Sequence, residues 1–270
     1  MYLNKYYTYQ GENCYTACVY NILKYMGVNE LIEAEILCSN EFLNLLCRTE
    51  YDAVFIDNVK NSKMILKEFG INVVQEKYQG IEFLKRRIKE HGVVMLHINS
   101  RKLQYSKVFT SENQENRYHY VNILDINEKD AYISDGYIPD KNGIYEGWVS
   151  LENLLLESSD ITYIEHDNDF YIDKEICVSN IHRSINSALK SNGNVYKLFC
   201  DNMRSLKESN LSVKSRKHIA YEMAVTLGIG GAKTSIYVLK ELLVQYGIYD
   251  KEDPVIVELV QVKQNCNTCV

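Results

Sequence analysis

The most informative stretch of this chain is Gln10-Gly-Glu-Asn-Cys14-Tyr-Thr-Ala17-Cys18-Val-Tyr-Asn21-Ile-Leu-Lys-Tyr-Met-Gly27. After Cys14, apolar residues recur at three- and four-residue spacing, which predicts an amphipathic helix over 14–27. Cys14 would lie at the N-terminus of that helix. Unpaired backbone N–H groups and the helix dipole lower a thiol pKa there and can also bind an oxyanion. Cys14 is therefore a candidate thiolate nucleophile.

Cys14 is a better candidate than the neighbouring Cys18. Cys18 follows one helical turn later, inside the body of the predicted helix, where a buried thiol is inert. A competing interpretation treats Cys14 as a small apolar residue of a core helix, which is the commoner role of a cysteine in a cytosolic chain. The polar Gln10 upstream and the polar residues described next favour the nucleophile.

A histidine and an aspartate lie in two strand-like runs further along the chain. His119 opens the run His119-Tyr-Val-Asn-Ile-Leu, and Asp135 closes Ala131-Tyr-Ile-Ser-Asp135. If the runs form a hairpin through Asn127-Glu-Lys129, a three-residue loop places Asp135 on the same face as His119, within hydrogen-bonding reach. A two-residue loop turns Asp135 to the other face unless a bulge corrects the register. Taken alone, His119 and Asp135 also suit a strand end and a turn.

Composition limits the class of protein. The 270 residues are 46% hydrophobic and 24% charged, which is typical of a globular chain of one or two domains. The formal charge of −6 argues against nucleic acid as a partner. No run approaches the ~18 apolar residues of a membrane span, and no export signal is recognisable, so we expect a cytoplasmic protein that binds no membrane.

The eight cysteines are interpreted as free thiols, because an export signal is not recognisable. Cys266-Asn-Thr-Cys269 has the spacing of a redox motif or half a zinc site, but no second pair completes it, and we expect a tail without a metal. His97, in the apolar run 93–98, is interpreted as a core histidine because no acid follows it at a comparable spacing.

Periodicity divides the chain near residue 174. Helices and short strands come first, an antiparallel sheet follows, and helices complete the chain. We predict a first domain over 1–174, a helical subdomain over 175–265 and a tail over 266–270. The predicted helices are 14–27, 31–47, 60–69, 79–91, 180–189, 195–207, 213–227 and 232–246, with turns at 192–194 and 228–231. The predicted strands are 52–56, 71–76, 92–98, 117–126, 130–135, 143–149 and 161–165.

These motifs resemble a known family. Over residues 1–165 the chain resembles the C39-peptidase-like branch of the papain-like fold. The resemblance lies in an upstream Gln, Cys-x-x-Ala at a helix start, His-Tyr-Val and a strand ending in Asp. With the helical C-terminal part, the chain is also similar to butirosin-type acyltransferases and to cysteine-protease-like amide synthases of the kind found in closthioamide biosynthesis. The resemblance implies an α+β papain-like fold, with N-terminal helices packed on an antiparallel sheet and a helical C-terminal subdomain.

The same resemblance implies a role for each matching residue. Cys14 would be the nucleophile, His119 the base and acid, Asp135 the group that orients the imidazole, and Gln10 an oxyanion donor. The implied partners are an acyl or peptidyl carrier protein, which carries the 4'-phosphopantetheine, and a small amine acceptor. The chain itself would need no cofactor. Where the C39 pattern usually has Asp-Cys-Gly, this chain has Asn13-Cys14-Tyr15.

Three classes of function stay open at this point. Residues of these types suit an amide-forming acyltransferase of secondary-metabolite biosynthesis, and they equally suit a cysteine peptidase or thioesterase. The freestanding helical C-terminal part favours the transferase. A binding module that kept the fold and lost the activity is the alternative of another class, and a structural helix bundle is disfavoured by the predicted sheet.

Overall fold

The structure of the chain is a computed structural model, and the residues that it describes are 6–38, 45–50, 53–58, 63–110, 118–138, 143–154, 156, 159–166, 171–207, 212–213, 215–217, 219 and 232–268. The chain forms two compact units. The first comprises Met1–Glu33 with Leu66–Ile172, and the second comprises Ala34–Ile65 with Asp173–Val270. The chain passes between the units three times: within the short helices α2 (Glu33–Cys38) and α3 (Lys63–Glu68), and between Ile172 and Asp173.

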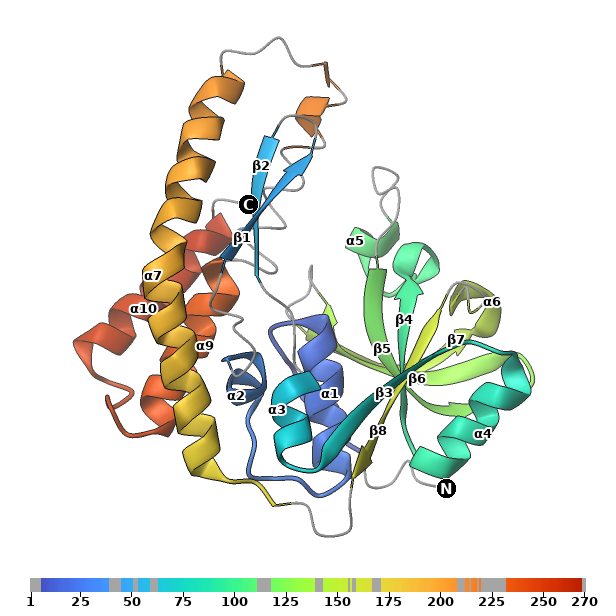
Figure 1. Cartoon of the computed structure of the whole chain (residues 1–270). Coiled ribbons are helices and arrows are strands. Elements are labelled where there is room, and N and C mark those ends of the chain that lie inside the picture. Colours follow the sequence, from blue (N-terminus) through green and yellow to red (C-terminus); the bar gives the residue numbers. More distant parts are fainter. Residues whose placement is uncertain are drawn as a thin grey trace. The chain divides into compact units, whose positions relative to one another are not determined.

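The first unit is built on a six-stranded sheet (Figure 1). All five pairs of neighbouring strands are antiparallel. The predicted α+β class with an antiparallel sheet is therefore confirmed. In spatial order the strands are β3 (Ile71–Lys77), β8 (Asp160–His166), β4 (Val94–Asn99), β5 (Tyr118–Ile126), β6 (Asp130–Ile138) and β7 (Gly143–Ser150).

Helices pack on both faces of this sheet. Successive side chains of a strand point to opposite faces, and on β5 Asn122 points to α1 (Cys14–Tyr25), where it donates a hydrogen bond to the Cys18 carbonyl oxygen at 3.0 Å. Its neighbour Ile123 points the other way and packs with Phe83 of α4 (Ile81–His91). The other helices of the unit are short: η2 (Ser100–Lys102), α5 (Lys107–Thr110) and α6 (Leu151–Leu154).

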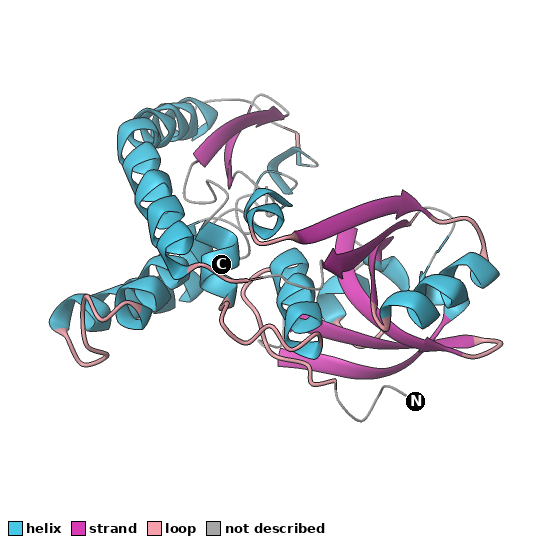
Figure 2. Cartoon of the chain, turned by 60° about the horizontal axis from the view of Figure 1, so that its bottom comes forward, coloured by secondary structure: helices cyan, strands magenta, loops and turns pink. Residues whose placement is uncertain are grey.

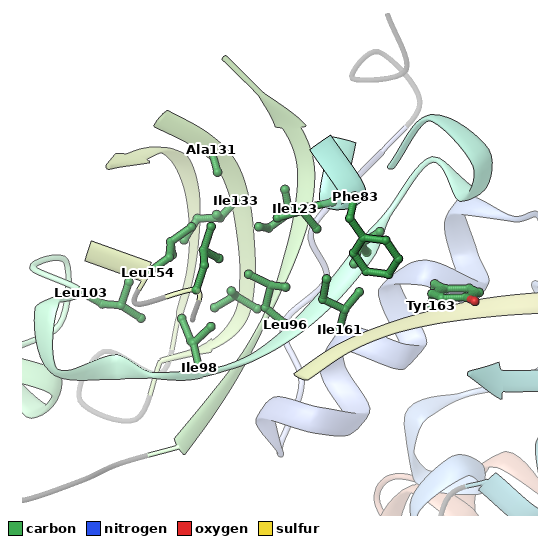
Figure 3. Close-up of a cluster of buried hydrophobic side chains, with 14 of the residues drawn as sticks. Phe83, Leu96, Ile98, Leu103, Ile123, Ala131, Ile133, Leu154, Ile161 and Tyr163 are labelled. Atoms are coloured by element: carbon green, nitrogen blue, oxygen red, sulfur yellow. The ribbon is translucent and has the colours of Figure 1, made fainter. Parts of the chain in front are cut away.

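The apolar core of the unit lies on the α4 face of the sheet (Figure 3). Alternate residues of the central strands supply it, and removing such a side chain from water stabilises the fold by roughly 1.5–3 kcal/mol. This packing makes the sheet a rigid support for side chains at its ends. Its fully buried members include Leu96, Ile98, Leu103, Val121, Ile123, Ala131, Ile133, Leu154 and Ile161.

The α1 face of the sheet is held by buried polar contacts as well. The Asn122 side chain also donates to the Tyr6 hydroxyl at 2.9 Å, and that hydroxyl lies 3.2 Å from the hydroxyl of Ser134 on β6. Buried polar groups are stable only when they are hydrogen-bonded, and hydrogen bonds have narrow geometric limits. These contacts therefore fix the position of α1 along β5 and β6.

The second unit is mainly helical (Figure 2). Its hairpin of β1 (Leu45–Glu50) and β2 (Ala53–Asn58) contacts the long helix α7 (Lys174–Lys207). Two further helices, α9 (Ala232–Gln245) and α10 (Pro254–Thr268), contact each other. The buried carboxylate of Glu35 forms a 2.6 Å ion pair with Lys174 and accepts a 2.6 Å hydrogen bond from Tyr246. These two contacts join α2, α7 and the end of α9.

Two secondary-structure predictions are wrong, and one helix has no predicted counterpart. The helix expected over 31–47 ends at Cys38, and strand β1 begins at Leu45 because β2 offers it an antiparallel partner. The turn expected at 192–194 is absent because α7 continues through it; tertiary contacts override the cost of Gly193, about 1 kcal/mol in a helix interior. Helix α10 was not predicted, and it reaches into the expected tail at 266–268.

Other expectations lie partly or wholly outside the described residues. Most of the helix expected over 213–227 and the turn at 228–231 belong to this group, as do Cys269 and the side chain of Cys266. The division into 1–174, 175–265 and 266–270 stays a prediction. Within the part of the chain that the structure describes, no helix combines the length and the apolar character that crossing a bilayer requires.

Gly136 of β6 gives a test of the α1 packing. We predict that Gly136→Ala destabilises the protein by about 1–3 kcal/mol, because the new Cβ would lie 2.8 Å from Asn21 Nδ2 and from the Tyr9 carbonyl oxygen. Gly193→Ala is the matched control: its Cβ meets nothing within 4 Å, and alanine should stabilise the helix by about 1 kcal/mol. Urea denaturation followed by circular dichroism should give opposite signs, and a similar loss in both variants would contradict the prediction.

Candidate active site

Cys14 is the first residue of α1, where the sequence predicts the helix to begin. The preceding residue, Asn13, is the N-cap: its backbone is extended (φ −147°, ψ 137°), and its buried side chain accepts hydrogen bonds from the N–H groups of Tyr15 and Thr16. An Asn cap satisfies N–H groups that have no partner within the helix. It therefore fixes the helix start and leaves the half-buried Cys14 thiol at the positive end of the helix dipole.

His119 and Asp135 form a buried pair beside this helix end. The Nε2 atom of His119 lies 2.7 Å from Asp135 Oδ2, and the two side chains are only 4% and 0% exposed. The hydrogen bond that the sequence predicts between them is present. A carboxylate at this distance orients the imidazole ring and stabilises its protonated form.

The register that brings the pair together depends on a β-bulge. Asn127 and Asp130 pair through a 2.9 Å backbone hydrogen bond, so the loop between β5 and β6 has only two residues. Such a loop alone would turn Asp135 to the wrong face, but the register shifts between Ile123 and Asp125. The extra residue there returns Asp135 to the same face of the sheet as His119. Of the two predicted arrangements, a three-residue loop or a bulge, the chain therefore has the bulge.

The thiol of Cys14 contacts the imidazole of His119 through a side-chain hydrogen bond. Since Nε2 faces Asp135, the other ring nitrogen, Nδ1, is the one available to the thiol. Burial lowers the pKa of His119, but the charge of Asp135 and the hydrogen bonds to Asp135 and Cys14 outweigh burial and raise the pKa to about 10. At neutral pH His119 is therefore an imidazolium, which can stabilise a Cys14 thiolate.

Tyr105 is a member of the site that sequence reasoning missed. Its hydroxyl donates a 2.9 Å hydrogen bond to Asp135 Oδ2, while the Tyr137 backbone N–H donates to Oδ1 at 2.9 Å. The ring of Phe109 packs on His119 with 4.6 Å between ring centroids. Both oxygens of Asp135 are thus hydrogen-bonded, which is what a buried carboxylate requires. Tyr105 lies in a turn after η2, where no periodic pattern marks it.

The segment before Cys14 is attached to the sheet and to α1. The Gly11 N–H donates to the Gly136 carbonyl oxygen at 2.8 Å, and Tyr9 exchanges hydrogen bonds with the Asn21 side chain at 2.7 and 3.1 Å. Gln10 lies between these two anchored residues with an exposed side chain. Its role as an oxyanion donor stays a prediction.

Glu33 is a second residue that sequence reasoning missed. Its buried carboxyl group accepts hydrogen bonds from the Glu12 N–H at 3.1 and 3.0 Å and from the Thr16 hydroxyl at 2.7 Å. Burial raises the pKa of Glu33 to about 7, although hydrogen bonds from Thr16 and from the backbone of Glu12 and Asn13 oppose the rise. An acidic side chain is rarely buried, so its residue type gave no signal.

The prediction for His97 needs correction. We expected a core histidine without an acid, but its side chain is 25% exposed and its Nδ1 lies 4.0 Å from Asp160 Oδ2. Asp160 pairs with His97 across β4 and β8, so its proximity comes from sheet pairing and not from sequence spacing. The His97 ring stacks on Tyr120 at 4.4 Å between centroids, and Tyr120 meets Tyr15 edge-on at 5.0 Å. This aromatic row, Tyr15 with Tyr120 and His97, reaches Cys14 through its neighbour Tyr15.

Cys18 is buried, as predicted, and lies in the body of α1. Burial, together with the charges of Asp135, Cys14 and Glu33, raises its pKa well above the usual range, so Cys18 is a thiol at neutral pH. Among the described residues, no group of three or more His, Cys, Asp or Glu side chains lies close enough to hold a metal ion.

No family model and no curated protein matches this chain. Among solved structures, the chain is similar to the crystal structure of a Bacillus anthracis protein described as a C39-like peptidase. The likeness covers 62% of this chain and 98% of that one, with 15% sequence identity and a TM-score of 0.41. At these values it carries no functional conclusion, so the function is derived from the site residues.

Asp135→Asn tests the cause of the high pKa of His119. We predict that the pKa falls from about 10 to below 6.5, because burial, the largest effect, would then be opposed only by the contact with Cys14. NMR titration of labelled histidine should find His119 still protonated at pH 8 in the wild type and neutral at pH 7 in the variant. Asp160→Asn is the control, because Asp160 faces His97, and it should leave His119 protonated at pH 8.

The same shift predicts how stability depends on pH. The folded pKa of His119 lies above the 6.5 of a solvent-exposed histidine in the unfolded chain, so the stabilisation from protonation is complete below pH 6.5 and is lost as the pH rises through about 10. Over that interval the wild type should lose stability relative to Asp135→Asn in urea denaturation. An unchanged difference between pH 6.5 and 10 would contradict this assignment.

Proposed function

We propose that the chain is a cysteine-dependent acyltransferase that forms amide bonds. It would take an acyl or peptidyl group from a carrier-protein thioester, hold it on Cys14 and transfer it to a small amine. The observation that carries this proposal is the contact between Cys14, at the start of α1, and a His119 imidazolium held by Asp135. A nucleophile, a base and an orienting carboxylate in this order are the parts that acyl transfer requires.

In the first half-reaction, the Cys14 thiolate attacks the thioester carbonyl carbon. The resulting oxyanion would be stabilised by the backbone N–H of Cys14 and by Gln10. The intermediate then collapses, the bond to the carrier sulfur breaks, and His119 gives its proton to the departing thiolate. The products are acyl-Cys14, a neutral imidazole and a free thiol on the 4'-phosphopantetheine arm of the carrier. One thioester replaces another, so the free-energy change of this step is close to zero.

In the second half-reaction, the acceptor amine attacks the acyl-Cys14 carbonyl carbon. His119 takes the proton that the amine nitrogen loses, and Cys14 leaves as a thiolate. This restores the resting thiolate and imidazolium and releases the amide. A reducing compartment keeps such a thiol from oxidation, and we place the reaction in the cytoplasm.

Hydrolysis by the same three residues is the second candidate, in the form of a peptidase or a thioesterase. Water can attack acyl-Cys14 wherever an amine can, so the acceptor decides the outcome. The half-buried aromatic row of Tyr15, Tyr120 and His97 favours transfer, because it offers apolar surface beside Cys14 for an acyl chain or an acceptor.

The proposal is tested by the intact mass of the protein after exposure to small acyl thioesters. We predict that the wild type gains one acyl group, that Cys14→Ala gains none, and that His119→Ala is acylated at least about 100-fold more slowly at pH 7, the scale of a lost acid-base group. Cys18→Ala is the matched control and should be acylated, because Cys18 is buried and is a thiol at neutral pH.

Adding a diamine to the acylated protein separates the two candidates. Release of the acyl group as an amide supports the transferase. Release only as the free acid supports a hydrolase. Absence of acylation from any thioester or peptide would refute both and would support a binding module.

A further inference from the structure

We propose that Glu33 is a positioning residue whose ionised carboxylate holds the nucleophile segment, residues 11–16, in its reactive conformation. This inference rests on the proposed role of Cys14 as the nucleophile. Glu33 touches neither substrate nor reacting atoms; it would act through the backbone that carries Cys14. The reactivity of Cys14 would then depend on the protonation of the Glu33 carboxyl group, in addition to His119 and Asp135.

The contacts of Glu33 lie on both sides of Cys14. Before it, the Glu12 N–H donates to both carboxyl oxygens, at 3.1 and 3.0 Å, and the Asn13 N–H donates as well. After it, the Thr16 hydroxyl donates to Oε1 at 2.7 Å. The carboxyl group therefore joins the loop that precedes the helix to the first turn of the helix, with Cys14 between them.

The packing around Gly11 leaves the carboxyl group little freedom. A Cβ at Gly11 would lie 2.8 Å from Glu33 Oε1 and 2.5 Å from the Ala17 Cβ, so only glycine fits between the carboxyl group and α1. Glu33 itself is 4% exposed. A carboxyl group confined in this way cannot move to find new partners when its protonation changes.

Protonation would remove part of what the segment depends on. An ionised carboxylate only accepts hydrogen bonds, and the donors around it are two backbone N–H groups and one hydroxyl. A protonated carboxyl group loses the charge that strengthens these hydrogen bonds, and its new O–H needs an acceptor; the Thr16 hydroxyl can accept it only by turning its own proton to the Asn13 carbonyl oxygen, 3.4 Å away. The backbone N–H groups then have a weaker acceptor and the Thr16 hydroxyl no longer donates to the carboxyl group, so the segment would relax away from it.

The surroundings set the pH at which this happens. Among the residues that the structure describes, the titratable groups that interact with Glu33 are the carboxyl group of Glu12 and, from α1, the thiol of Cys18 and the phenol of Tyr20. None of these groups can carry a positive charge, so none of them offsets the charge of the carboxylate. Burial, together with the charge of Glu12, raises the pKa of Glu33 to about 7, and the reactive conformation is therefore favoured above pH 7 and lost below it.

The first experiment measures the rate of Cys14 alkylation by iodoacetamide from pH 5 to 9, by mass spectrometry of the Cys14 peptide. For the wild type we expect a rise of about tenfold centred near pH 7, in addition to any titration of the thiol itself. In Glu33→Gln this step should be absent, and the rate at pH 8 should stay near the low-pH level. Labelled glutamate allows a direct check, because a carboxyl ¹³C resonance that titrates near pH 7 should disappear in the variant.

Two substitutions should move the step in opposite directions. Thr16→Val removes a hydrogen bond that lowers the pKa of Glu33, so the step should move to higher pH, and Thr16→Ser, which retains the hydroxyl, should restore it. Glu12→Gln removes a charge that raises the pKa but retains the backbone N–H, so the step should move to lower pH. A residue that merely supports the fold would change stability without moving the pH profile.

Each outcome decides for or against the inference. A wild-type step in Glu33→Gln overturns it, and so does a uniform loss of rate with an unchanged step. If Glu33→Gln does not fold, the Thr16 and Glu12 variants give the answer, because a step that neither of them moves also overturns it. If the alkylation step behaves as expected but thioesters never acylate Cys14, the proposed acyl transfer fails and the role of Glu33 stands.

Discussion

The buried pair of His119 and Asp135 is the interaction that the rest of the first unit must accommodate. Two charged groups away from water are stable only when their geometry is good and their remaining hydrogen-bonding positions are filled. Here Tyr105 and the Tyr137 backbone fill those of Asp135. The pair therefore requires that β5, β6 and the turn after η2 meet in one arrangement, and the apolar core on the α4 face keeps the strands in that arrangement.

The nucleophile is positioned from a different direction from its base. His119 belongs to the sheet, whereas Cys14 belongs to a helix whose start is fixed by Asn13, by the Gly11 contact to β6 and by Glu33. The candidate site therefore lies where a helix N-terminus meets the end of a strand. Reactivity would depend on two sets of hydrogen bonds that titrate separately, near pH 10 at His119 and near pH 7 at Glu33.

Features that depend on local periodicity were predictable from the sequence. The start of α1 follows from an apolar stripe, and the shared face of His119 and Asp135 follows from the period of two in a strand together with the expected three-residue loop or bulge. Features that depend on distant pairing were not predictable. Asp160 reaches His97 only through the pairing of β4 with β8, Tyr105 lies in a turn without a pattern, and residues 45–50 form a strand because β2 pairs with them.

The bulge in β5 has a consequence for how such a chain can change in evolution. Surface loops usually tolerate the loss of a residue. Leu124 lies in β5, where it is the extra residue that corrects the register of the hairpin, so its loss would have a different effect. Its deletion would exchange the two faces of β5 from residue 123 back to 118, turning His119 toward α1 and Tyr120 toward the apolar core. Relatives of this chain can therefore vary in residue type along the strand far more freely than in its length.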